Sequence, residues 1–357
     1  MNCSNIRSLA LFCVLSGAFI LSGFFDMSVN AADFFTGAER DQAVYFPQVF
    51  PQVPPICLKD AQGPLTFADK VKYYKLAADQ GDTIAQLEYG NCLRYGFSVK
   101  KDLVEAVKYY KLAADQKHPI AQCRYGWCLD NAVGINQDCV EAAKYFKLAA
   151  KQGNANAQCN YGLSLSNGRG VDVNFVKSAK YYKMAADQNY PAGQLCYGWC
   201  LEKGIGVGKN SVLAAKYYKL AADQDEMNAQ FSYGKCLFYG IGVEKDLIGA
   251  VRYYRLSADQ GNAKAQFDYG CCLERGCVVP ENSVMAAEYY KLAADQGHVD
   301  AQFNYGLCLE DGSGVPKNLV KAARYYRLAA DSGDAEAQAG YDRCVKLQKR
   351  IERRRKK

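Results

Sequence analysis

The sequence predicts an all-α solenoid built from a 36-residue helix–turn–helix repeat, and two observations support this. Pairs of aromatic residues recur every 36 residues; they begin at Tyr73, Tyr109, Tyr145, Tyr181, Tyr217, Tyr253, Tyr289 and Tyr325. A fixed period of this length is typical of solenoids, in which each unit stacks only on its neighbours. Each period also contains two helical stretches separated by a glycine-containing turn.

Counting from Ala85 as position 1, seven full repeats span residues 85–336, with a half repeat at each end. We therefore expect one elongated solenoid domain over residues 67–345. The flanking segments differ in composition and are expected to be a signal peptide (1–31), a proline-rich linker (32–66) and a basic tail (346–357).

The first helix of each repeat is predicted from a single apolar stripe. In the repeat that begins at Ala229, positions 1, 5, 8 and 9 are Ala229, Tyr233, Cys236 and Leu237, which lie along one helical face. Gly240 follows the stripe, and glycine accepts the left-handed backbone that commonly ends a helix. We call this predicted helix the A helix.

The second, or B, helix is predicted to begin after Asp246, whose carboxylate can accept the free N–H groups of a first helical turn. The equivalent positions are always Asp or Asn: Asp102, Asp138, Asn174, Asn210, Asn282 and Asn318. The paired tyrosines at positions 25 and 26 are expected in the core, beside small alanines that let helices approach. The cations at positions 24 and 27 are expected on the outer face, with Lys219 in ion-pair range of Asp223.

This pattern, AQxxYGxCLxxGxGVxxDxxxAxxYYKLAADQG, resembles the Sel-1-like repeat, a branch of the tetratricopeptide-type solenoids. The resemblance implies a right-handed superhelix with an inner groove formed largely by the A helices. It also implies adaptor or scaffold work without catalysis. A cysteine-rich branch of the family is described as binding or hydrolysing β-lactams and pairs two cysteines per repeat. Ala222 and Gln230 stand at about those places here, and a β-lactamase-like hydrolase is kept as an alternative.

Seven of the sixteen cysteines share position 8: Cys92, Cys128, Cys200, Cys236, Cys272, Cys308 and Cys344. This position faces the predicted core, where cysteine acts as a small hydrophobe. Equivalent residues of stacked helices lie roughly 8–10 Å apart, whereas a disulfide needs Cα atoms within about 7 Å. We therefore expect free thiols; a few disulfides or a metal site are the alternatives, although no C-x-x-C spacing supports a metal.

No set of residues in the sequence predicts catalysis, a cofactor or a metal. His118 and His298 are the only histidines; both occupy position 34, five repeats apart. The net charge of +7 equals the charge of the tail alone, where eight cations accompany Glu352. The solenoid is therefore neutral overall, which argues against nucleic acid as its ligand.

The N-terminus predicts export. Arg7 precedes the mostly apolar residues 8–25, and Val29-Asn30-Ala31 has small residues at the positions required for cleavage after Ala31. A periplasmic or secreted protein is expected, and unpaired cysteines would suit delivery into a reducing compartment such as a host cell. The alternative is an uncleaved anchor that makes the protein a membrane-tethered assembly factor.

Binding residues are expected where the repeats differ from one another. Positions 3, 7 and 10 of the A helix point away from the predicted core stripe. Large aromatic side chains at such places are typical anchors for a protein or peptide partner. The candidates are Trp127 and Trp199 at position 7, Phe231, Phe267 and Phe303 at position 3, and Tyr95 and Tyr239 at position 11. For position 3, packing between repeats is the alternative.

Overall fold

The computed structural model describes residues 66–355, which form sixteen helices and no strands. The A helices are α4 (Thr83–Tyr95), α6 (Pro119–Asn131), α8 (Ala155–Asn167), α10 (Pro191–Lys203), α12 (Met227–Tyr239), α14 (Ala263–Arg275), α16 (Val299–Asp311) and α18 (Ala335–Arg355). The B helices are α3 (Phe67–Asp79), α5 (Leu103–Asp115), α7 (Cys139–Lys151), α9 (Phe175–Asp187), α11 (Ser211–Ala222), α13 (Leu247–Asp259), α15 (Ser283–Asp295) and α17 (Leu319–Asp331). The predicted fold class and repeat are confirmed.

The segments predicted as signal peptide and linker lie outside the described residues, apart from the last residue of the linker, Thr66. At the other end, α18 continues through the basic segment as far as Arg355, so most of the predicted tail extends the last A helix. In the part of the chain described here, no helix is both long and apolar enough to cross a membrane.

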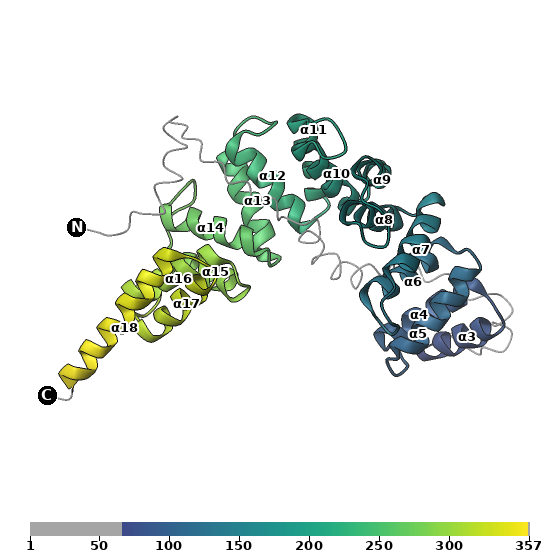
Figure 1. Ribbon diagram of the computed structural model, residues 1–357, viewed down its shortest axis with the longest axis horizontal. Coiled ribbons are helices and arrows are strands. Elements are labelled where there is room, and N and C mark those ends of the chain that lie inside the picture. Colours follow the sequence, from purple (N-terminus) through teal and green to yellow (C-terminus); the bar gives the residue numbers. More distant parts are fainter. Residues whose placement is uncertain (1–65, 356–357) are drawn as a thin grey trace.

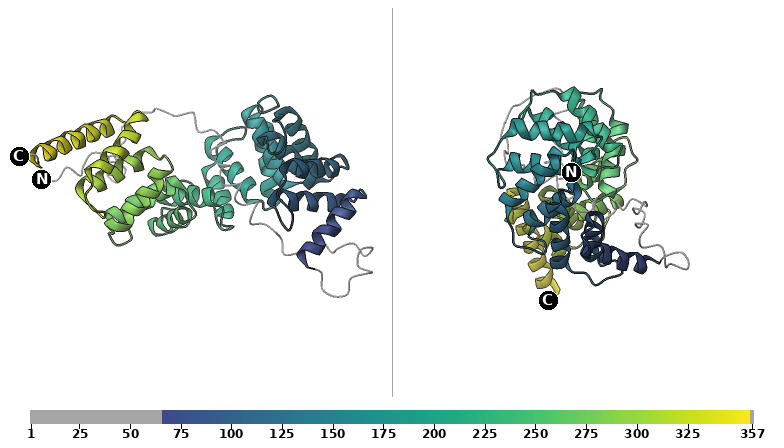
Figure 2. Two further views of the ribbon diagram at one scale, coloured as in Figure 1. Left: turned by 90° about the horizontal axis from the view of Figure 1, so that it is seen from below. Right: turned by 90° about the vertical axis from the view of Figure 1, so that its right-hand side faces the viewer.

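The helices stack in sequence order into an arch that winds as a right-handed superhelix (Figures 1 and 2). Two pairs of neighbouring A helices contact one another directly, α8 with α10 and α16 with α18, and no pair of B helices within residues 66–355 contacts as extensively. The A helices therefore lie on the inner, concave side of the superhelix and the B helices on the outer side.

The second tyrosine of each pair, at position 26, fills the space between the two helices of a repeat. Tyr218 is 1% exposed, and its ring packs against Gly198 at position 6 of the A helix. A Cβ atom on Gly198 would lie 2.9 Å from two ring carbons of Tyr218. Glycine at position 6 is therefore required by the aromatic ring, and the same contact recurs in all seven full repeats, with Phe146 in place of the tyrosine in the second.

The first tyrosine of each pair, at position 25, joins one repeat to the next. Its ring meets the position-5 tyrosine edge to face, with centroids 5.0 Å apart for Tyr233 and Tyr253, a favoured aromatic geometry. In five of the seven full repeats its hydroxyl donates to the aspartate at position 31 of the preceding repeat, for example Tyr289 to Asp259 at 2.6 Å. That aspartate also faces the position-27 cation, as predicted for Lys219 and Asp223, which lie 2.6 Å apart.

A ladder of glutamine hydrogen bonds, which was not predicted from the sequence, joins the A helix of a repeat to the ends of the two B helices beside it. The Gln296 Nε2 group donates to Gln266 Oε1 at 2.8 Å, and Gln266 in turn donates to the Ala258 carbonyl at 3.1 Å. Equivalent glutamine pairs occur in the first six full repeats. In the seventh, Ser332 replaces the outer glutamine, and the buried Gln302 Oε1 has no hydrogen-bond partner.

Helix ends follow the predicted capping. All seven predicted Asp or Asn caps of the B helices accept a backbone N–H three residues later. Gly240 ends α12 in the left-handed conformation with φ of 69°. At position 14, where five full repeats have glycine with positive φ, Val278 also has a φ of 61°, which is costly for a β-branched residue.

Candidate functional site

The concave surface of α10, α12 and α14 contains a cavity of about 790 Å³. It brings together three predicted binding residues: Trp199, Phe231 and Phe267. The Phe267 ring stacks on His298, which precedes α16, with centroids 4.8 Å apart. All four side chains are partly buried. The superhelix thus places three aromatic rings from three successive repeats around one hollow.

Trp127 and Tyr95 lie toward the N-terminal end of the same surface and do not line this cavity. The Arg94 guanidinium lies 4.1 Å from the centre of the Trp127 ring and 5.4 Å from that of Tyr95. Both contacts fall within the range of cation–π attraction. The two predicted tryptophan anchors therefore have different surroundings: a cavity at Trp199 and an arginine at Trp127.

The structure corrects the expectation for position 3. Leu87, Leu195 and Phe303 are buried there, and Phe303, at 9% exposure, packs against Tyr326 with centroids 5.7 Å apart. Phe303 therefore belongs to the core and offers little surface to a partner. Phe231 and Phe267 occupy the same position but are only partly buried and line the cavity, so position 3 differs from repeat to repeat. Tyr239, by contrast, is 42% exposed.

Charged groups surround the cavity. Burial raises the pKa of Asp268 to about 6; Asp300 adds to this effect and Lys235 opposes it. Burial also acts to raise the pKa of Glu202, but hydrogen bonds from Lys203 and Tyr218 outweigh it and bring the pKa below its usual value. The cavity thus combines aromatic walls with a carboxyl group, Asp268, that is poorly solvated.

Both histidines serve as helix caps. The Nδ1 atoms of His118 and His298 accept the backbone N–H groups of Ala121 and Ala301 at 3.4 and 3.3 Å. Burial lowers the pKa of both imidazoles, which agrees with a neutral ring that accepts at Nδ1. Within residues 66–355, no cluster of three or more His, Cys, Asp or Glu residues is arranged to hold a metal ion.

The position-8 cysteines lie in the core, as predicted, and all seven are free thiols and buried. Burial raises the pKa of Cys92 and Cys200 to about 12 and that of Cys128 to about 11. Such thiols carry almost no thiolate at neutral pH and are poor nucleophiles in the folded protein.

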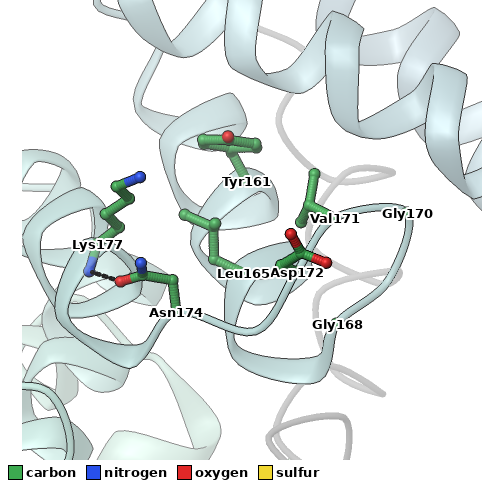
Figure 3. A pocket seen from close by; sticks show the side chains of 8 residues that line it. All are labelled: Tyr161, Leu165, Gly168, Gly170, Val171, Asp172, Asn174 and Lys177. Atoms are coloured by element: carbon green, nitrogen blue, oxygen red, sulfur yellow. Dashed lines mark hydrogen bonds between the residues drawn. The ribbon is translucent and has the colours of Figure 1, made fainter.

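A second hollow, of about 670 Å³, lies at the turn between α8 and α9 (Figure 3). Its walls include Tyr161, Leu165, Gly170 and the cap residue Asn174, whose Oδ1 accepts the Lys177 backbone N–H at 2.9 Å. These residues occupy repeat positions with the same structural roles elsewhere in the chain. This hollow is therefore a product of the ordinary turn.

The charged residues of the concave face at position 4 were not predicted from the sequence as site residues. Asp268 stands there in the sixth repeat and Arg124 in the second. Both share the A-helix face with position 7, one turn away. The sequence does contain a signal for this position. When the repeats are aligned, position 4 varies from acid to base to cysteine, whereas positions 5 and 6 are constant.

Comparisons with known proteins agree with this architecture. The profile of the Sel1 repeat family matches residues 71–82, 83–118, 119–154, 155–190, 191–226, 228–262, 263–298 and 299–334. The chain belongs to the Sel1 repeat family. Sel1 repeats are generally protein-interaction scaffolds without enzymatic activity. No curated protein matched the chain.

Two crystal structures of Sel1 repeat proteins resemble the chain over most of its length. A protective antigen of uropathogenic Escherichia coli that displays an SLR fold is 32% identical, with a TM-score of 0.63. The match covers 77% of this chain and 59% of the antigen, so the chain spans about three fifths of that protein. A Sel1 repeat protein from Oxalobacter formigenes is 26% identical over 93% of this chain and 92% of its own, with a TM-score of 0.61.

Proposed function

We propose that this Sel1 repeat protein is a non-enzymatic scaffold that binds a segment of a partner protein along its concave face. Trp127 and Trp199 are the proposed main anchors, and Phe231 and Phe267 are proposed to hold the segment in the cavity beside Trp199. Tyr95 and Tyr239 would contact it at the edges. The observation that carries the proposal is the cavity that three aromatic residues of three repeats share.

The spacing of the tryptophans suits an extended segment. They are two repeats apart, or about 20 Å at roughly 10 Å for each packed layer. A strand-like segment of about six residues spans that distance at roughly 3.3 Å per residue. Tryptophan and tyrosine side chains are also enriched among the hot spots of protein interfaces.

Replacement of both tryptophans by alanine tests the proposal. A peptide selected for binding to the parent protein from a random dodecamer display library would serve as the probe, and its affinity would be measured by fluorescence anisotropy. We expect the double variant to lose about 2–4 kcal/mol of binding free energy, as for a hot-spot pair. Leu148→Ala is the control, because Leu148 is 48% exposed on the B helix α7 and should leave binding unchanged.

The melting temperature separates the two roles of the tryptophans. A lost affinity with a nearly unchanged melting temperature supports the proposed site, since the fold depends on contacts between repeats. A large drop in melting temperature would instead assign Trp127 and Trp199 to the core. Unchanged affinity in the double variant would contradict the proposal.

We further propose that the protein is exported and that its signal peptide is removed after Ala31. The support is the sequence alone: Arg7, the apolar residues 8–25 and the small residues Val29 and Ala31. The N-terminal sequence of protein recovered from outside the producing cytoplasm tests this. We expect it to begin at Ala32, and a chain that retains Met1 would contradict it.

A further inference from the structure

Two arginines on the concave face of the first two repeats lack an acidic partner. Arg94 lies on α4 at position 10, and Arg124 lies on α6 at position 4. Neither forms an ion pair within residues 66–355. The Nη1 atom of Arg94 and the Nε atom of Arg124 are buried and have no hydrogen-bond partner. A buried cationic donor without an acceptor lowers the stability of the folded protein, so two such donors on one surface indicate a role other than stabilising the fold.

The two guanidinium groups lie close to the same side chains. Arg94 stacks on Trp127, which follows Arg124 by one helical turn on α6. Arg124 has a side-chain hydrogen bond with Tyr95, the residue next to Arg94. Both guanidinium groups also act electrostatically on the hydroxyl of Tyr110 and the thiol of Cys128. They therefore form one positively charged site, which we call the arginine pair.

The nearest acid along α6 is already engaged. Asp130 lies 3.2 Å from the Arg169 guanidinium, which also donates to the Asp130 carbonyl at 2.7 Å. The hydroxyl of Tyr110 donates to Asn91 at 2.9 Å rather than to a carboxylate. The chain itself thus supplies no anion to the arginine pair within the described residues.

The pair also departs from the charge pattern of the repeats. At position 10 the later full repeats have Asp130, Ser166, Glu202, Phe238, Glu274 and Glu310, and Arg94 is the only cation there. At position 4 the other full repeats have Glu88, Asn160, Cys196, Ser232, Asp268 and Asn304, so Arg124 is the only cation in that column too. The fold places these two exceptions side by side.

The C-terminal end of the same solenoid shows how an arginine on this face is satisfied. Glu310, at position 10, accepts two hydrogen bonds from Arg343 of α18, each 2.6 Å long. It also accepts the hydroxyl of Tyr326 at 2.8 Å. Tyr326 is the equivalent of Tyr110, which lies beside the arginine pair. In the first repeats, the carboxylate that would play the part of Glu310 is the missing component.

We infer that the arginine pair binds a carboxylate of the partner segment, namely the side chain of an aspartate or glutamate. The planar fork of each guanidinium matches a carboxylate with two parallel hydrogen bonds. A side chain is favoured over a chain terminus because the donors lie partly below the surface, where a side chain can reach while its backbone stays in the groove. This inference rests on the proposed concave-face function and specifies one chemical feature of the partner.

The two tryptophans offer a direct optical test. In a Trp199→Phe background, Trp127 is the only tryptophan of the chain, and its ring is in contact with Arg94. The probe is glutarate at up to 50 mM, with sodium chloride at matched ionic strength as the blank. We expect a saturable change in Trp127 emission that is at least halved in Arg94→Gln and in Arg124→Gln. Lys235→Gln, which removes a cation elsewhere on the face, should respond like its parent.

A pair of peptides then identifies the source of the carboxylate. The first is Ac-Ala-Ala-Glu-Ala-Ala-NH2, and the second is Ac-Ala-Ala-Gln-Ala-Ala with a free C-terminal carboxylate. We expect only the glutamate peptide to change the emission of Trp127. A response to the free terminus alone would overturn the assignment to a side chain.

Stability measurements distinguish a binding role from a structural one. Because no residue between 66 and 355 supplies an anion to the arginine pair, Arg124→Met should melt at the same or a higher temperature than the parent, while losing the glutarate response. A marked loss of stability in both Arg124→Met and Arg94→Gln would make the arginines structural and overturn the inference. So would the absence of any glutarate response in the parent, or a response that persists in both variants.

These measurements do not depend on the proposed anchors. Glutarate is too small to reach from Trp127 to Trp199, so its binding reports the arginine pair alone. If peptide affinity depends on the tryptophans but glutarate has no effect, the proposed function stands and this inference fails. If glutarate binds but the tryptophans are dispensable for peptide binding, this inference stands and the proposed anchors fail.

Discussion

The glutamine ladder allows a matched gain and loss of one hydrogen bond. In the sixth full repeat, Gln296 donates to the buried Gln266 Oε1 at 2.8 Å. In the seventh, Ser332 occupies the position of Gln296, and Gln302 Oε1 has no partner. Ser332→Gln should therefore complete the ladder, and Gln296→Ser should break it in the preceding repeat.

The expected magnitudes follow from burial. Gln266 is 3% exposed and Gln302 is 6% exposed, so an amide oxygen left alone there costs about 1–3 kcal/mol. Fixing a glutamine side chain costs up to about 2 kcal/mol of entropy, which offsets part of the gain. We expect Gln296→Ser to destabilise its repeat by about 1–2 kcal/mol and Ser332→Gln to stabilise the last repeats by about 1 kcal/mol.

Hydrogen–deuterium exchange with mass spectrometry is the suitable assay, because a solenoid can open locally instead of unfolding in one step. A change of 1 kcal/mol alters local opening about fivefold. We expect exchange in α16 and α17 to slow by about that factor in Ser332→Gln, and exchange in α14 and α15 to accelerate in Gln296→Ser. Ser313→Gln, in an exposed turn, is the control. Unchanged exchange in both ladder variants would refute the assigned role of these hydrogen bonds.

Four further outcomes are expected. Gly198→Ala should lower the free energy of unfolding by about 1–3 kcal/mol, because the new methyl group clashes with the Tyr218 ring. Gly208→Ala is the control and should not, because no atom lies within 4 Å of its new Cβ. Equal urea midpoints for the two variants would contradict this expectation. Burial raises the pKa of Asp268 from 3.8 to about 6 in the folded protein, so the stability that its protonated form contributes is complete below pH 3.8 and is lost as the pH rises through 6. The free energy of unfolding of Asp268→Asn should then exceed that of the parent by about 1–3 kcal/mol at pH 7.5 but by little near pH 4. A gain in stability that does not depend on pH in urea titrations would contradict this expectation. Val278→Gly should raise the melting temperature by relieving a left-handed backbone worth about 1 kcal/mol, and a lower value would show that the turn is unstrained. Finally, most position-8 cysteines should be alkylated only after denaturation without reductant, and mass spectrometry that finds fewer than about half of them labelled would indicate disulfides.

The predicted binding residues show where reasoning from the sequence reached its limit. Position 7 was predicted to point away from the core, and Trp199 in that column borders a cavity, whereas Asn91 is buried. At position 3, where packing was kept as the alternative to binding, Phe303 is buried, and a helix wheel does not show that a second B helix covers that side. The binding roles of Trp127, Trp199, Phe231, Phe267, Tyr95 and Tyr239 stay predictions.

The sequence by itself determined the features that depend on contacts within one repeat. The 36-residue period, the A and B helices, the caps at Asp246 and its equivalents, and the inward position-8 cysteines all follow from helical periodicity and local hydrogen bonding. Each of these features is repeated up to eight times, so a coincidental residue at one position does not change the prediction.

Tertiary structure alone decided which residues of different repeats meet. Tyr289 reaches Asp259 across 30 residues, Gln266 reaches the Ala258 carbonyl of the preceding repeat, and Arg94 comes to lie over Trp127 on the next A helix. These pairings depend on the angle and offset at which successive repeats stack. That geometry is set by the summed packing of whole helices, so no single position in the sequence reveals it.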